Sequence, residues 1–313
     1  MAKGKAPREG HGAGSERDFV GYGEHPPRVR WPGDARVAVS LVVNYEEGSE
    51  HSYAFGDAEQ ESYKEFPKIL PPGVRDYANE SAYEYGARAG FWRLLRIFAR
   101  HEIPVTYYCC AVALERNEAA ARAIAAHGHE VCSHGYRWEE PYTKSEAVER
   151  EEIAKAVASL KRTTGHRPVG WYSRYAPSAH TRRLLAEEGG FLYDSDSYAD
   201  DLPYWTQVSG KPWLVVPYSL EANDIKFWAN AAFATGQDFC QYLKDSLDVL
   251  WEEGAETPRM MSAGLHLRII GRPGRAKALD DFIAYARAKG GVWFARRNDI
   301  ATVWREQFPP PGR

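Results

Sequence analysis

The chain has 313 residues, of which 44% are hydrophobic and 27% charged, an ordinary composition for a globular protein with a sizeable core. The formal net charge is −3 and no basic stripe is present, which argues against nucleic acid and anionic membrane as partners. No apolar run approaches the roughly 18 residues of a membrane span, and the cysteines form no Cys-x-x-Cys pair, so we expect a cytoplasmic protein.

Residues 1–18 are polar and Gly-rich, which predicts a disordered tail with no signal peptide. Residues 19–313 alternate between apolar β-branched runs and amphipathic helical patterns with no linker, so we expect one domain. The expected strands are 35–44, 105–112, 130–133, 169–173, 191–194, 214–217, 260–267 and 291–295. The expected helices are 83–101, 117–127, 145–164, 181–188, 238–253 and 276–289. Residues 49–81 have little periodicity and predict a long functional loop.

Strands that alternate with helices imply parallel βαβ units, and the predicted fold is α/β, a distorted (β/α) barrel of about seven parallel strands. Polar side chains come directly after several of these strands. Because the carboxyl ends of barrel strands share one rim, we expect an active site there. The residues concerned are Glu46, Glu47, His134, Arg174, Asp194, Asp196 and His266.

The stretch VCSHGYRWEE contains half of a familiar metal clip. Two histidines one helical turn apart share a face and can bind one metal ion. Here His134 is followed four residues later by Trp138, whose indole is no zinc ligand. Any chemistry at this strand end must therefore be done with other groups.

The chain resembles the polysaccharide deacetylase superfamily (carbohydrate esterase family 4, NodB homology), and within it the allantoinase-like (PuuE-like) branch. The resemblance runs from about Asp18 to Trp304. The stretches that carry it are VNYEEGSE, YEYGARAGFWRLLRIF, SHGYRW, EEGGFLYDSDSYADDLPYW, VVPYSLEANDIKF and GLHLRIIGRPGRAKAL.

The resemblance implies roles for single residues. The family's aspartate pair, a base and a metal ligand, matches Glu46 and Glu47, and its metal-binding histidines match His134 and Trp138. The resemblance implies no cofactor, with a single zinc held by Glu47 and His134 as the alternative. The expected catalytic residues are Glu46, Glu47 and His266, and the expected substrate-binding residues are His134, Trp138, Arg174 and Asp196.

We expect a hydrolase of a carbon–nitrogen bond in a cyclic amide, ureide or imide. Without a metal, one of the paired glutamates would act as a base of raised pKa, and His266 would protonate the leaving nitrogen. One alternative is a metal-dependent deacetylase of an N-acetyl sugar, and another is a non-catalytic small-molecule binder. The expected partners are a small-molecule substrate and further copies of the chain in a homo-oligomer.

Overall fold

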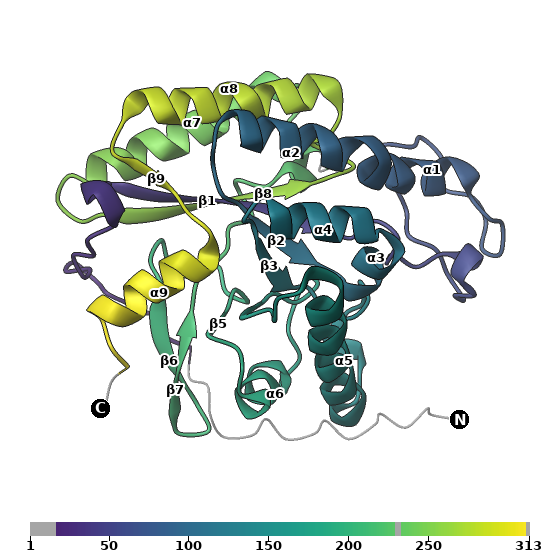
Figure 1. Cartoon of the computed structure of the whole chain (residues 1–313), viewed down its shortest axis with the longest axis horizontal. Helices are drawn as coiled ribbons and strands as arrows, with labels where there is room; N and C mark the ends of the chain where they lie inside the picture. The colour runs from purple at the N-terminus through teal and green to yellow at the C-terminus, as the bar shows by residue number, and fades with distance from the viewer. Residues whose placement is uncertain (1–16, 229–232, 311–313) are drawn as a thin grey trace, which may run out of the picture.

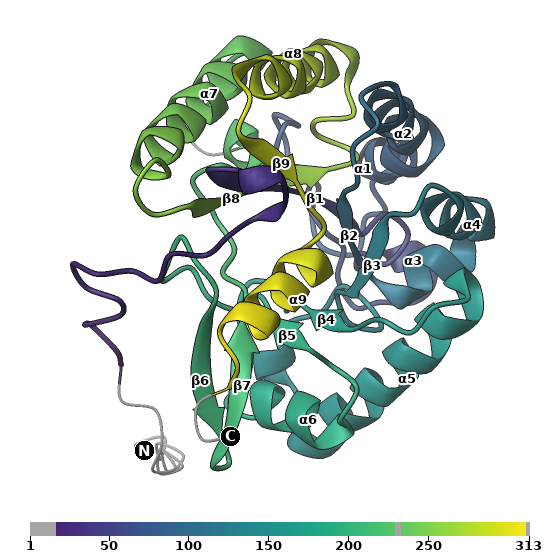
Figure 2. The same cartoon turned by 60° about the vertical axis from the view of Figure 1, so that its left-hand side comes forward.

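The computed structural model describes residues 17–228 and 233–310, so nearly all of the expected tail, 1–18, lies outside the described residues. The described residues form a nine-stranded, mostly parallel sheet in the order β6-β7-β5-β4-β3-β2-β1-β8, with β9 beside β1 (Figure 1). Figure 2 shows the sheet curled into a half-barrel with helices around its outside. The expected single-domain α/β barrel is confirmed.

The strands run parallel except for one hairpin, formed by β6 and β7. The expected strand 105–112 stops at Cys109, and the expected strand 214–217 overlaps only the last two residues of the strand that pairs with β6. β6 was not predicted, because only one of its five residues is buried and its sequence, YWTQV, mixes aromatic and polar residues. The strands are β1 (Val37–Tyr45), β2 (Thr106–Cys109), β3 (Glu130–Ser133), β4 (Gly170–Trp171), β5 (Tyr193–Asp194), β6 (Tyr204–Val208), β7 (Lys211–Val215), β8 (Arg259–His266) and β9 (Val292–Phe294).

The helices begin and end largely where their capping residues predict. Ser145 caps α5 by accepting a hydrogen bond from the Val148 amide, and Gly165 and Gly189, both with positive φ, end α5 and α6. Two helices, α3 and α9, were not predicted, and α1 begins six residues before the predicted helix 83–101, within the predicted loop 49–81. The helices are α1 (Tyr77–Tyr85), α2 (Phe91–Arg100), α3 (Ala111–Arg116), α4 (Glu118–Ala126), α5 (Glu146–Thr164), α6 (Thr181–Glu188), α7 (Gly236–Glu253), α8 (Pro273–Lys289) and α9 (Arg297–Gln307), with a π-helical turn, η3 (Gly86–Gly90), joining α1 to α2.

Side-chain alternation along β1 decides which residues face the barrel interior. Val39, Leu41 and Val43 pack into the core shared with the outer helices, whereas Ala38 and Val42 belong to the inner core. Successive side chains of a strand point to opposite faces, so the even-numbered residues face inward. The same alternation directs Asn44 into the barrel mouth. Beyond the end of β1, it directs Glu46 into the barrel mouth and Glu47 towards the helices.

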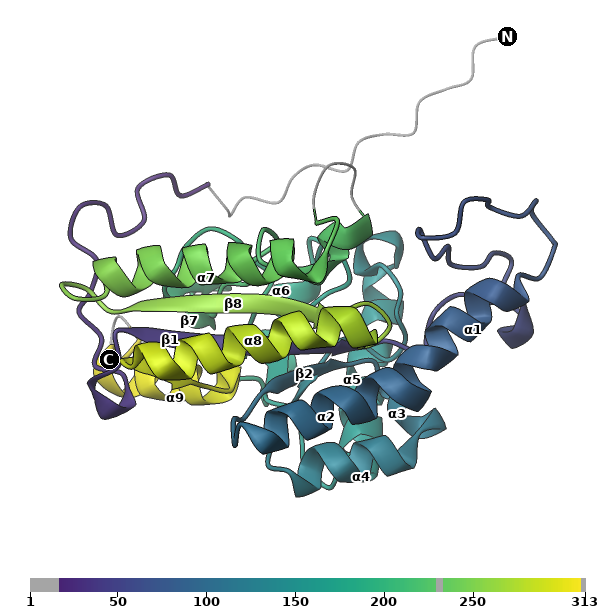
Figure 3. The same cartoon turned by 90° about the horizontal axis from the view of Figure 1, so that it is seen from above.

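Strand register brings the polar strand ends to one rim. A single row of paired residues crosses the sheet, from Tyr45 through Cys109, Ser133, Trp171 and Asp194 to Val215. On the other side of β1, Asn44 pairs with His266. Residues just after this row therefore surround the barrel mouth. Figure 3 shows that α1 and the segment before it extend beyond the end of the sheet at which β1 and β8 finish.

A buried arginine from α9 fills the barrel between β8 and the end of β7. Arg297 donates hydrogen bonds to Ser262 Oγ on β8 at 2.8 Å, to Ser195 Oγ at 3.0 Å and to the Pro217 carbonyl at 2.6 Å. These bonds link β8 to the ends of β5 and β7, with which it does not pair. Among the described residues, no helix is both long and apolar enough to cross a membrane.

Candidate active site

A cavity of about 350 Å³ opens at the rim where the strands end. A cavity of this size suits a small molecule. Its lining contains five of the seven expected catalytic and substrate-binding residues, namely Glu46, His134, Trp138, Arg174 and His266. The other lining residues are mostly aromatic or polar: Asn44, Glu61, Ser62, Lys64, Tyr83, Tyr172, Tyr175, Tyr218, Leu220, Asn223, Ile225 and Trp228.

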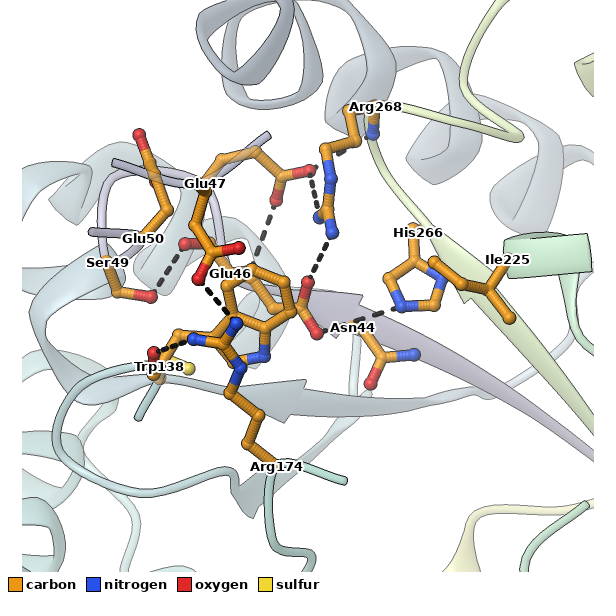
Figure 4. A network of polar contacts seen from close by, with 12 residues as sticks. Asn44, Glu46, Glu47, Ser49, Glu50, Trp138, Arg174, Ile225, His266 and Arg268 are labelled. Carbon is orange, nitrogen blue, oxygen red and sulfur yellow. Dashed lines mark hydrogen bonds and ion pairs between the residues drawn. The ribbon is translucent and has the colours of Figure 1, made fainter. Parts of the chain in front are cut away.

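Glu46 is the central acid of this cavity (Figure 4). Its Oε1 atom lies 3.3 Å from His134 Nε2 and 3.7 Å from His266 Nε2. Its Oε2 atom lies 2.8 Å from Nη2 of Arg268, a residue that the sequence analysis did not assign. One oxygen of the carboxylate therefore faces two imidazoles, and the other faces a guanidinium.

These neighbours fix the charge of Glu46. Burial alone would raise the pKa of the Glu46 carboxyl, but the positive charges of Arg268, His266 and His134 outweigh burial and lower it well below its usual range. Glu46 is therefore ionised at neutral pH. This corrects our expectation of a pocket base with a raised pKa.

His266 is held by a buried aspartate, Asp224, which the sequence analysis also did not assign. Asp224 Oδ1 lies 2.6 Å from His266 Nδ1, and Asp224 Oδ2 accepts hydrogen bonds from the amides of His266 and Ile270. Burial would lower the pKa of His266, but Asp224 and Glu46 together raise it above its usual value. His266 thus favours the protonated state, with its Nε2–H directed to the cavity side, where Glu46 lies.

His134 is oriented by the backbone. Its Nδ1 atom lies 2.8 Å from the Tyr172 carbonyl, which can only accept, so Nδ1 carries a proton. The ring also stacks on Tyr172 with centroids 5.2 Å apart. These two contacts fix the ring so that Nε2 points to Glu46.

Glu47 does not line this cavity. Its Oε1 accepts a hydrogen bond from the Arg268 amide at 3.1 Å and pairs with Arg268 Nη1 at 3.3 Å, while Oε2 accepts from the Glu46 amide at 3.1 Å. Burial, only partly offset by Arg268, raises the pKa of Glu47. The raised pKa predicted for one of the pair thus belongs to the glutamate that faces the helices.

Trp138 and Arg174 form one wall of the cavity. The Arg174 guanidinium lies 3.8 Å from the Trp138 ring centroid and donates to the Trp138 carbonyl at 2.6 Å. Arg174 is also paired with Glu61, from the long segment before α1, and lies 3.3 Å from Glu140. Because Nη1 and Nη2 are hydrogen-bonded to Trp138 and Glu61, Arg174 shapes the wall and holds the segment that contains Glu61.

Asp196 lies behind the cavity wall rather than in it. Its two oxygens accept hydrogen bonds from Ser173 N at 2.7 Å and Ser173 Oγ at 2.8 Å. Burial and the neighbouring Asp194 raise the pKa of Asp196 to about 7. These hydrogen bonds hold Ser173, the residue before Arg174. Asp196 therefore supports Arg174 from behind, and Arg174 lies between Asp196 and a bound molecule.

The positions that match the deacetylase metal ligands do not fit a metal ion here. Glu47 is turned to Arg268, and Trp138 offers no donor atom. A catalytic zinc needs about three protein ligands. Among residues 17–228 and 233–310, no group of three or more His, Cys, Asp or Glu side chains is arranged to hold one.

Known proteins share both this sequence and this fold. The family description "Polysaccharide deacetylase" matches residues 80–193. A Schizosaccharomyces pombe protein whose name assigns it to the polysaccharide deacetylases is 38% identical over 94% of this chain and 98% of its own. The chain belongs to the polysaccharide deacetylase family.

Solved structures of this family include two that match almost the whole chain. One, from Pseudomonas aeruginosa PAO1 and named for a polysaccharide deacetylase, is 51% identical over 94% of this chain and 99% of its own, with a TM-score of 0.89. The other, a PuuE allantoinase, is 49% identical over 95% of this chain and 99% of its own, with a TM-score of 0.90. These family members support a hydrolase that acts on carbon–nitrogen bonds.

Proposed function

We propose that the protein hydrolyses a carbon–nitrogen bond in a cyclic ureide or imide, without a metal ion. The observation that carries this proposal is the position of Glu46 Oε1, within 3.7 Å of the Nε2 atoms of both His134 and His266 at the cavity wall. This arrangement puts an ionised carboxylate and a protonated imidazole on one side of a small-molecule cavity. The 49% identity to an allantoinase supports a cyclic ureide as the substrate class.

The chemistry needs a base, an acid and a site for the developing oxyanion. Glu46 takes a proton from the attacking water as the water oxygen bonds to the carbonyl carbon. His266, held by Asp224, gives its Nε2 proton to the ring nitrogen as the carbon–nitrogen bond breaks. His134 Nε2, 3.3 Å from Glu46 Oε1, faces the position of the attacking water and orients it towards Glu46. Glu46 Oε1 and His266 Nε2 are 3.7 Å apart, so a small movement of either side chain brings them within hydrogen-bond distance and lets Glu46 return its proton to His266 before the next turnover.

The low pKa of Glu46 makes it a weak base, which favours an activated substrate. An imide or ureide carbonyl in a strained ring is more electrophilic, and its nitrogen leaves more readily, than an unactivated acetamide. A deacetylase of N-acetyl sugars would need stronger activation of water, which a metal normally supplies.

The test is a turnover screen of chelator-treated, dialysed protein. The substrates are allantoin, substituted hydantoins, succinimide and N-acetylglucosamine oligomers, with ring opening followed by chromatography. We expect ring opening of at least one cyclic compound and no release of acetate. Acetate release that appears only when zinc is added back would favour the deacetylase, and silence on every compound would favour a non-catalytic binder.

A further inference from the structure

Arg268 is a cation enclosed by the walls of the active site. It follows β8, two residues after His266, and is fully buried. Its guanidinium lies 4.7 Å from the ring centroid of Tyr83, 5.2 Å from that of Trp138 and 5.3 Å from that of Trp228. All three rings also line the cavity, so one layer of aromatic side chains separates this charge from a bound molecule.

The charge of Arg268 is balanced by both glutamates at the end of β1. Nη2 lies 2.8 Å from Glu46 Oε2, and Nη1 lies 3.3 Å from Glu47 Oε1. Neither Nε nor Nη2 of Arg268 has a hydrogen-bond partner among the described residues. The Nη2 contact is therefore an ion pair without hydrogen-bond alignment, and the guanidinium is held there mainly by charge and by the surrounding rings.

A cation shared by two acids at a strand end has a clear electrostatic effect. Two buried carboxylates on adjacent residues repel each other, and one of them would take up a proton unless a positive charge lies between them. Arg268 remains charged at any physiological pH. It anchors Glu46 by one oxygen and leaves the other facing the cavity.

We propose that Arg268 is a positioning residue that replaces a metal as the fixed cation of this site, and that it acts on the reaction only through Glu46. This inference rests on the proposed function, because it gives Glu46 the role of base. It also explains how the site operates with Trp138 at the position of a metal ligand. The positive charge is supplied by the Arg268 side chain, which lies in the turn after β8.

The experiment compares three substitutions of Arg268. Arg268→Met keeps most of the volume without the charge, Arg268→Lys keeps a charge that cannot bridge two carboxylates, and Arg268→Ala leaves room for methylguanidinium. We expect kcat to fall about 100- to 1,000-fold in the Met and Ala variants, with KM little changed. Removal of one electrostatic group from an active site typically has an effect of this size. Lys should restore part of this loss, and millimolar methylguanidinium should restore activity to Arg268→Ala but not to Arg268→Met.

Arg174→Ala is the matched control, because Arg174 also contacts Trp138 but pairs with Glu61 and Glu140. Added methylguanidinium should not raise its kcat. Thermal unfolding of every variant, with and without methylguanidinium, gives a readout independent of substrate. Recovery of Tm in Arg268→Ala without recovery of kcat would overturn the inference, as would full kcat in Arg268→Met. Wild-type silence on every compound would instead refute the proposed function, and with it the catalytic role of Arg268.

Discussion

Arg174 and Arg268 approach the same indole, that of Trp138, yet their surroundings differ. Arg174 is reached by two acids from loops, Glu61 and Glu140, and by the Trp138 carbonyl. Arg268 is paired with Glu46 and Glu47, which follow a central strand directly. The first guanidinium holds a loop against the cavity, and the second sets the charge of the cavity's acid.

The two arginines therefore differ in how their acidic partners are held in place. Glu46 and Glu47 are placed by β1, which pairs with strands on both sides, so their ion pairs have little freedom. Glu61 lies in the long segment between β1 and α1, and only its contacts hold it in place. Substitutions near Arg268 should therefore change catalysis, and substitutions near Arg174 should change binding.

The largest effect is expected at the acid paired with Arg268. Glu46→Gln removes the base, and we expect kcat to fall by about 1,000-fold, within the range for loss of a general base. Glu61→Gln is the control on the Arg174 side and should mainly raise KM. Steady-state kinetics of the two variants measure kcat and KM separately and so distinguish the two effects. A Glu46→Gln variant that keeps kcat within a factor of about ten would show that another group activates water.

Asp224→Asn tests the acid that faces Glu46. We expect kcat to fall by about 100-fold, because the imidazole loses the partner that favours its protonated form. Asp224 raises the pKa of His266, and an acid is active only below its pKa, so activity is lost as pH rises through that value. The alkaline limb of the kcat pH profile should therefore move to lower pH in the variant. An unmoved alkaline limb would contradict the assignment of His266 as the acid.

Arg174→Gln should weaken substrate binding rather than chemistry. Loss of the Arg174–Glu61 pair frees the segment before α1, and loss of one charged hydrogen bond corresponds to about a tenfold rise in KM. Limited proteolysis should cut residues 49–76 faster than in the wild type. Unchanged cleavage together with reduced kcat would mean that Arg174 acts on the reaction directly.

The smallest effect is expected from restoring a metal ligand. Trp138→His recreates the spacing of two histidines from His134, but Glu47 remains bound to Arg268, so we expect only weak zinc binding. Calorimetry of the variant against the wild type measures this, and Trp138→Phe is the control for loss of the indole alone. Tight, stoichiometric zinc binding would show that Glu47 turns readily from Arg268.

The sequence predicted the barrel because its strands are buried runs separated by capped helices, and local patterns of this kind are set by neighbouring residues. It placed Glu46, His134 and His266 at one rim for the same reason. Asp224 and Arg268 were missed, although both lie in stretches that carry the family resemblance. Their roles depend on contacts with residues far away in the chain, Asp224 with His266 and Arg268 with Glu46, and no local periodicity encodes such pairs.

Gly86, the first residue of the π-helical turn η3, carries a consequence for sequence variation. A Cβ atom built there would lie 2.5 Å from Glu47 Oε1, although its φ of −55° is ordinary for any residue. The space, rather than the backbone, excludes alanine. A shorter aspartate at position 47 would vacate that space, so the two positions should exchange together. Glu47→Asp and Gly86→Ala combined should be tolerated better than the sum of the two single changes, and an alignment of relatives should show the pair co-varying.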